Sequence, residues 1–136
     1  MRLHRHTFRL LAVSGNVTTD QASPAYRIEP SVNDNARDID QSFLLHLQFS
    51  QNGGATSPTT KVKLQTSMDK QNWVDVLEST QLTADGSKAE TKDTAPSGLP
   101  LLKWVRAITV LGGATRPSHT AEVWLTSDAP FTCKLS

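Results

Sequence analysis

The sequence predicts an all-β protein, built as a single antiparallel β-sandwich of about eight strands. Polar and apolar residues alternate with a period of two in several separate segments. Clusters of Gly, Pro, Asn and Asp interrupt these segments about every 10–15 residues. No window places apolar residues at helical spacing between a cap and a stop signal. A jelly roll is one form of sandwich that fits this pattern, and a closed barrel is the alternative.

The first half of the chain contains three expected strands. Residues 3–14 alternate as a strand does, and residues 25–29 form a short strand that Pro30 ends. The clearest strand covers residues 42–50, where every second residue from Phe43 to Phe49 is a large apolar residue. These apolar residues are expected to face the core.

A β-hairpin follows, and it is the most informative part of the sequence. Val62, Leu64 and Thr66 alternate with Lys and Gln residues, which indicates a strand with one buried face. The polar residues 67–72 are rich in turn formers, and strand character resumes at residues 73–76. Such a hairpin predicts architecture and carries no chemistry of its own.

The second half contains the remaining strands. Residues 78–86 indicate a strand edge that leads into an Asp-Gly turn, and residues 87–94 indicate an exposed strand. Three further strands are expected at residues 101–111, 119–127 and 131–135. The alternation predicts one core made of Phe43, Leu45, Leu47, Phe49, Val62, Leu64, Trp104, Ile108, Val110, Val123 and Leu125.

Length and charge narrow the class of protein. A chain of 136 residues is expected to form one domain, residues 1–136. The formal net charge of +1 supplies no field to recruit nucleic acid, and no segment has the roughly 20 apolar residues that cross a bilayer. The apolar run of residues 10–13 is too short for an export signal, so synthesis in the cytoplasm is expected. Cys133 is the only cysteine and is interpreted as a small buried side chain.

Two groups of residues could in principle bind a metal ion. His4 and His6 lie on one face of a strand, about 7 Å apart, and His46 or His119 could complete a zinc or nickel site. Asp38 and Asp40 could bind Ca²⁺. The favoured interpretations are a basic N-terminal segment and a solvated loop. No metal, cofactor or catalytic residue is therefore expected.

Three tryptophans are the other candidates for a binding role, because sugar rings stack on aromatic side chains. Trp104 is interpreted as core and Trp73 as a cover for one end of the core. Trp124 is placed opposite the core face of its strand, exposed or at an interface. The residues selected as a candidate interface are His4, His6, Phe8 and Trp124.

The hairpin also carries a resemblance to a known family. Residues 64–76 read Leu-Gln-Thr-Ser-Met-Asp, three further residues, then Trp-Val-Asp-Val, and residues 104–107 read Trp-Val-Arg-Ala. This combination resembles small β-sandwich proteins of tailed-phage virions. The hairpin is also similar to discoidin-type carbohydrate-binding sandwiches. The sialidase Asp-box turn is matched incompletely, since no Gly lies between Asp69 and Trp73.

The resemblance implies a non-enzymatic structural protein of a phage virion, expected to be a capsid decoration (cement) protein. Its expected partners are the major capsid protein and copies of itself in a homo-oligomer on the capsid surface. Residues 1–14 would then be an edge strand or an arm, and residues 15–41 a second arm. The alternative function is a carbohydrate- or receptor-binding module of a phage tail. An enzyme is the third possibility.

Overall fold

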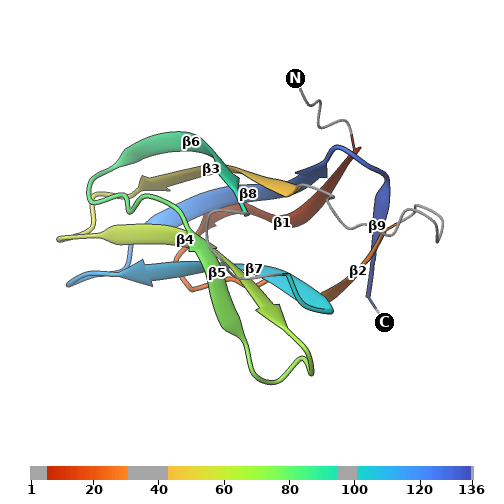
Figure 1. The fold of residues 1–136 in the computed structure, drawn as a ribbon. Helices are drawn as coiled ribbons and strands as arrows, with labels where there is room; N and C mark the ends of the chain where they lie inside the picture. The colour runs from red at the N-terminus through yellow and green to blue at the C-terminus, as the bar shows by residue number, and fades with distance from the viewer. Residues whose placement is uncertain (1–5, 31–42, 95–100, 136) are drawn as a thin grey trace.

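The structure is a computed structural model that describes residues 6–30, 43–94 and 101–135. Within these ranges the chain forms two antiparallel β-sheets that pack face to face and contains no helix (Figure 1). The predicted all-β sandwich is confirmed. The described ranges contain nine strands, close to the eight or so expected: β1 (His6–Val17), β2 (Tyr26–Pro30), β3 (Phe43–Asn52), β4 (Thr59–Ser67), β5 (Val74–Glu78), β6 (Gly86–Asp93), β7 (Trp104–Gly112), β8 (Ser118–Ser127) and β9 (Phe131–Lys134).

The order of the strands is that of a jelly roll. One sheet has the order β1-β8-β3-β6 and the other the order β5-β4-β7-β2-β9. The first eight strands therefore pair in a nested way, β1 with β8, β2 with β7, β3 with β6 and β4 with β5. This nesting is a long hairpin rolled into two layers, which is the jelly-roll arrangement. The additional strand β9 extends the second sheet beyond β2.

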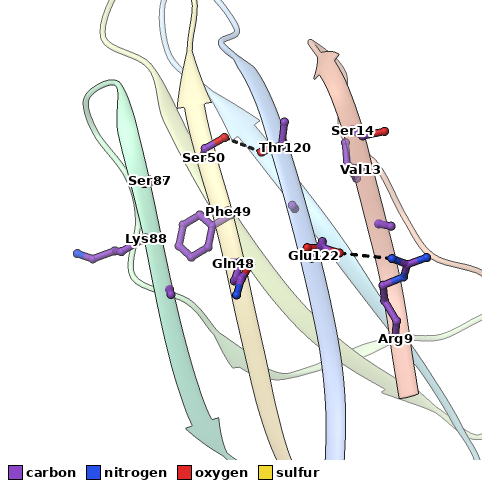
Figure 2. Close-up of a pocket in the computed structure, with 13 residues that line it drawn as sticks. Arg9, Val13, Ser14, Gln48, Phe49, Ser50, Ser87, Lys88, Thr120 and Glu122 are labelled. Carbon is purple, nitrogen blue, oxygen red and sulfur yellow. Dashed lines mark hydrogen bonds and ion pairs between the residues drawn. The ribbon is translucent and has the colours of Figure 1, made fainter. Parts of the chain in front are cut away.

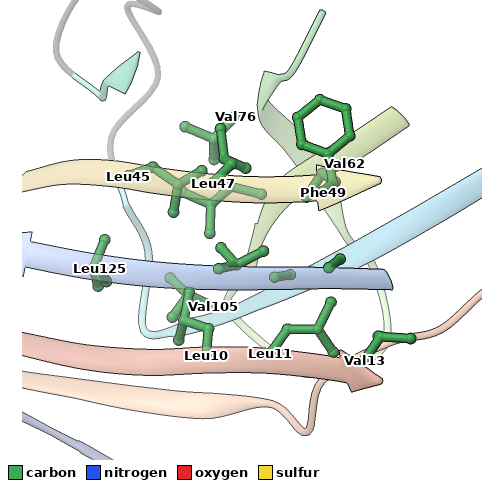
Figure 3. Close-up of a cluster of buried hydrophobic side chains, with 14 residues drawn as sticks. Leu10, Leu11, Val13, Leu45, Leu47, Phe49, Val62, Val76, Val105 and Leu125 are labelled. Atoms are coloured by element: carbon green, nitrogen blue, oxygen red, sulfur yellow. The ribbon is translucent and has the colours of Figure 1, made fainter. Parts of the chain in front are cut away.

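The core lies between the two sheets and is filled mainly by the inward-facing residues of β1, β3, β4, β7 and β8 (Figure 3). The inner positions of β3, β4 and β8 are those that the alternation predicts, and Val62, Leu64, Val123 and Leu125 are fully buried. Phe43, at the start of β3, is partly buried at one end of the core, where its ring packs edge-on against Phe131. The predicted faces of these three strands are confirmed.

The predicted core face of β7 is wrong. Pairing with β4 places Val105 opposite Thr66, Ala107 opposite Leu64 and Thr109 opposite Val62, so the odd-numbered residues of β7 face the core. Ile108 and Val110 lie on the outer face and are partly buried. Both faces of this strand are apolar in sequence, so alternation alone could not choose between them.

Trp104 is buried as expected, with 7% of its surface exposed, but it lies outside the core cluster. It shares the outer face of β7 with Arg106 and Ile108. Two lysines cover its ring, and the ammonium nitrogen of Lys70 lies 4.1 Å from the ring centroid. The covering groups are therefore cations, one from the β4–β5 turn and one from the residue before β7, and not the apolar core.

The N-terminal segment is an edge strand from His6 onward. β1 pairs with β8 along its length, with a β-bulge at Leu10 that leaves both Leu10 and Leu11 buried. Residues 1–5 lie outside the described residues.

The expected arm at residues 15–41 is wrong for the part that the structure describes. Ser23 donates a backbone hydrogen bond to Ala107 (2.8 Å), and Thr109 donates one to Gln21 (2.8 Å). The chain that leads into β2 is therefore bound to β7. Residues 31–42 lie outside the described residues.

The segment between β5 and β6 also differs from the prediction. Residues 79–82 do not form a strand. They are bound to β4 by isolated backbone hydrogen bonds, including a bridge between Leu82 and Thr60. This segment carries the chain from one sheet to the other. Glu90 of β6 secures it, because its carboxylate accepts hydrogen bonds from the Thr80 backbone N–H (2.9 Å) and hydroxyl (2.6 Å).

Candidate functional site

The outer face of the four-stranded sheet contains a hollow of about 710 Å³ (Figure 2). We call it the outer hollow. It crosses all four strands, and its larger polar side chains on the outer face come from β1, β8 and β3. The full lining is Arg9, Ala12, Val13, Ser14, Gln48, Phe49, Ser50, Ser87, Lys88, Ala89, Thr120, Ala121 and Glu122.

Small side chains explain why the sheet is hollowed at this place. The outer positions there are Ala12, Ser14, Ser50, Ala89 and Thr120, none of which extends far from the backbone. Ser50 and Thr120 are directly opposite on β3 and β8, and their hydroxyl oxygens lie 2.5 Å apart. The inner positions of the same strands carry buried core residues, so the backbone under the hollow is held in place.

Larger polar side chains border this base of small residues. The Arg9 guanidinium donates to a carboxylate oxygen of Glu122 at 3.4 Å, and the two side chains remain 51% and 42% exposed. The Gln48 amide donates to Nε2 of His46 at 3.2 Å, which leaves Nδ1–H of His46 to donate to the Thr91 hydroxyl at 3.4 Å. These contacts are long and solvent-accessible, so a ligand could replace them at small cost.

Trp124 lies in the row of residues next to the hollow. It is opposite His46 on β3 and Arg9 on β1, and it is partly exposed on the outer face of the sheet. The guanidinium carbon of Arg9 lies 5.7 Å from the centroid of its ring. An aromatic ring, an imidazole, an amide and an ion pair therefore lie side by side on one face.

The β4–β5 turn is held by its own side chains, which accounts for the Ser-x-Asp motif. The Ser67 hydroxyl accepts hydrogen bonds from the backbone N–H groups of Asp69 (3.1 Å) and Lys70 (3.0 Å). The Asp69 carboxylate accepts from the N–H groups of Asn72 (2.8 Å) and Gln71 (2.9 Å). These donors, with the Asn72 amide and the Ser67 hydroxyl, hold the pKa of Asp69 well below its usual range. The role of the motif is therefore structural.

A ladder of charged groups covers the outer face of the five-stranded sheet. Lys63 bonds to Asp75 at 3.0 Å, and the Gln65 amide donates to the other oxygen of that carboxylate at 2.7 Å. The hydrogen bond from Gln65, with the contribution of Lys63, lowers the pKa of Asp75. Gln65 also accepts from Arg106 at 2.8 Å, and the Arg106 guanidinium lies 4.3 Å from the Trp73 ring. Trp73 thus covers a cation on this outer face, not one end of the core as expected.

The four residues expected at an interface do not form one surface in the described part of the chain. His4 lies outside the described residues, and His6 is partly exposed at the start of β1, opposite Ser127. Phe8 points inward, where its ring packs edge-on against Tyr26 with centroids 4.9 Å apart. Of the four, Trp124 lies beside the outer hollow, opposite its lining residue Arg9.

The histidines considered as metal ligands lie on different faces. His46 is on the outer face of β3, whereas His119 is fully buried on β8. His119 donates through Nδ1 to the Val17 carbonyl (2.7 Å) and accepts at Nε2 from the Thr109 hydroxyl (2.9 Å), so both nitrogens are used in packing. Among the described residues no three His, Cys, Asp or Glu side chains come close enough to hold a metal ion. Asp38 and Asp40 lie outside that part of the chain.

Cys133 is half-buried on β9, opposite Ile28. Burial raises the pKa of its thiol to about 12, so the reactive thiolate is disfavoured. Cys133 is thus less buried than expected from the sequence.

Sequence reasoning missed Arg9, Gln48, Glu122 and the small residues between them. The signal was present, because these residues occupy the positions between the apolar ones in β1, β3 and β8. Each strand taken alone shows only an ordinary polar face. The hollow appears once strand order places β8 between β1 and β3.

Comparisons of the chain with protein-family models, curated proteins and solved structures find no match. In the part of the chain that the structure describes, no helix is long and apolar enough to span a membrane.

Proposed function

We propose that this chain is a non-enzymatic structural protein of a tailed-phage virion, acting as a capsid decoration protein that stabilises the head lattice. The observation that carries the proposal is the jelly-roll order of the strands, an arrangement that viral capsid domains use repeatedly. The resemblance of the β4–β5 hairpin to virion β-sandwiches supports the phage context. A fold alone does not determine a role, and the contact surface depends on its residues.

The outer face of β7 is the surface that best suits contact with the capsid. Ile108 and Val110 are aliphatic residues on an outer sheet face, beside Lys63 and Lys61 of β4. The two lysines bond to Asp75 and Glu78 of β5, which draws their charged ends away from β7. Arg106 and Trp73 lie on the same face. Aliphatic, aromatic and Arg side chains together are typical of the centre of a protein interface.

Decoration of a lattice requires many modest contacts instead of one deep pocket. Each copy would contact the major capsid protein through the β7 face, and neighbouring copies would meet in a homo-oligomer that follows the local lattice symmetry. The opposite sheet, with the outer hollow, would then face away from the capsid.

The test is to image phage particles with and without the protein. Density distributed over the head lattice is the expected result. The variant Val110→Glu places a charge on the β7 face and is expected to reduce lattice occupancy, while circular dichroism shows an unchanged fold. Thr126→Glu, on the outer face of the other sheet, is the matched control and should bind as the wild type does.

Density confined to the tail tip would contradict decoration. It would favour the alternative function, a carbohydrate- or receptor-binding module of the tail, for which the polar outer hollow with Trp124 beside it is the supporting observation. Equal loss of occupancy in both variants would show that the β7 face is not the contact surface.

A further inference from the structure

We propose that the outer hollow binds a neutral saccharide. This inference goes beyond capsid decoration and does not depend on it, because the site lies on the sheet opposite the proposed contact face. It rests on the side chains that border the hollow, their spacing across the sheet and their charge.

The side chains that line the hollow, together with His46 beside it, have the polar atoms that sugar hydroxyls require. Arg9, Gln48 and His46 supply donors, and the Glu122 carboxylate supplies acceptors. Guanidinium, amide and carboxylate groups each present two polar atoms side by side, which matches a pair of neighbouring hydroxyls on a sugar ring. The present contacts of 3.2–3.4 Å are long, so most of the hydrogen-bonding capacity of these groups is available to a ligand.

The register of the sheet holds these groups together. Gln48 is directly opposite Glu122, and His46 is directly opposite Trp124, on paired strands. Arg9 completes the row from β1, where it is opposite Trp124. Figure 2 shows Arg9, Glu122 and Gln48 side by side across three strands. Positions fixed by a β-ladder are already arranged before a ligand arrives, which reduces the entropy cost of binding.

Trp124 supplies the apolar surface that a sugar also needs. One face of a pyranose ring carries C–H groups, and these pack on an aromatic ring while the hydroxyls reach polar neighbours. Trp124 is partly exposed and next to both His46 and Arg9, so stacking and hydrogen bonding are possible for the same ligand.

The charge of the hollow selects a neutral ligand. Arg9 and Glu122 form an ion pair and cancel each other. Lys88 shares the inner side of the sheet with Phe49, and its side chain extends outward past the edge strand (Figure 2). A phosphate, a sulfate or a nucleic acid would therefore meet a carboxylate without a surplus of positive charge. The hollow, at about 710 Å³, is within the usual size of a ligand site and could admit a short oligosaccharide.

The experiment is a titration of the isolated, isotopically labelled full chain, followed by amide chemical shifts in NMR spectra. The probes are maltotriose, cellotriose, mannotriose, xylotriose and chitotriose, with a trimer of galacturonic acid and a heparin oligosaccharide as charged probes. At least one neutral probe is expected to shift the amides of residues 48–50 and 120–124 in a saturable way, with little dependence on salt.

Two variants remove the groups that carry the inference. Glu122→Gln keeps the shape of the side chain and removes the acceptor charge, and Trp124→Ala removes the stacking surface. Each is expected to weaken binding at least tenfold. Glu78→Gln is the matched control on the other sheet and is expected to bind as the wild type does.

Three outcomes would overturn the proposal. They are the absence of saturable shifts with every neutral probe, binding confined to the charged probes and lost at high salt, and equal weakening by Glu78→Gln. Trp124→Phe, which keeps an aromatic ring, provides a second test if Trp124→Ala fails to fold, and it should retain binding. Because the titration uses isolated protein, its failure would be distinct from failure of the capsid imaging.

Discussion

Leu64 is fully buried between the two sheets, at the middle of β4. Truncation to alanine would remove its methyl groups and leave a cavity that close packing on both sides prevents from closing. We expect Leu64→Ala to lower the free energy of unfolding by about 2–5 kcal/mol, measured by chemical denaturation. Met68→Ala, at a side chain that is 62% exposed, is the control and should change stability by less than about 0.5 kcal/mol. Equal effects of the two changes would show that Leu64 is not a core residue.

Asp69 should make the stability of the protein depend on acid. The backbone N–H groups of Asn72 and Gln71 hold its pKa below the ordinary value in the folded state. A lowered pKa stabilises the fold above the pKa of the unfolded chain, about 3.9, and this contribution disappears as the pH falls through the folded value. Asp69→Asn is therefore expected to lower Tm at about pH 6 and to lower it less at about pH 2, where part of the contribution is already lost.

Thermal unfolding followed by circular dichroism at the two pH values checks this expectation. Other carboxylates, such as Asp75, also lose their charge in acid, so the quantity to compare is the difference in Tm between variant and wild type. A difference that stays constant with pH would show that the turn does not depend on the ionised carboxylate.

At the scale of one element, β6 shows how an exposed edge is kept from pairing with another chain. Lys88 and Lys92 are opposite Phe49 and Leu45, so they lie on the core side of an edge strand. Charged residues in this position oppose edge-to-edge association, because pairing would bury them. We expect the double variant Lys88→Val/Lys92→Val to associate more strongly than the wild type, measured by sedimentation at increasing concentration.

The control for the edge strand places valines on its other face. Ser87→Val/Thr91→Val also places two valines on β6 and keeps both lysines. It should sediment as the wild type does. Association of both variants to the same extent would assign the effect to propensity and not to charge.

The individual strands also show why some elements could be predicted from the sequence and others could not. β3 and β8 have one apolar and one polar face, so alternation predicted both the strand and its buried side. β7 is apolar on both faces, and its side was decided by pairing with β4. Pairing joins distant parts of the chain, so it cannot be predicted from the local sequence of one strand.

The candidate site was hidden for a related reason. Trp124 was selected because a large aromatic residue at an outer position is conspicuous in sequence. Arg9, Gln48 and Glu122 are common surface residues, and their relation depends on strand order. His119 shows the opposite case, since a histidine that suggested metal binding is used to join Val17 and Thr109 inside the fold.

For the whole molecule, the nested topology makes completion of the fold depend on its last strands. β8 lies between β1 and β3, so the four-stranded sheet cannot form without it. A chain that ends at residue 113 is expected to lack cooperative thermal unfolding and dispersed amide signals in NMR spectra. The full chain is the control. A cooperative transition in the shortened chain would show that the five-stranded sheet is stable alone.

The alternation that separates core from surface also separates two kinds of evolutionary change. On β8, Ala121, Val123 and Leu125 are buried, whereas Thr120, Glu122 and Trp124 lie on the outer face between them. A substitution at an outer position leaves the packing of its neighbours intact, so its effect on stability should be small. Single changes can therefore alter the surface chemistry of the outer hollow while the fold remains the same.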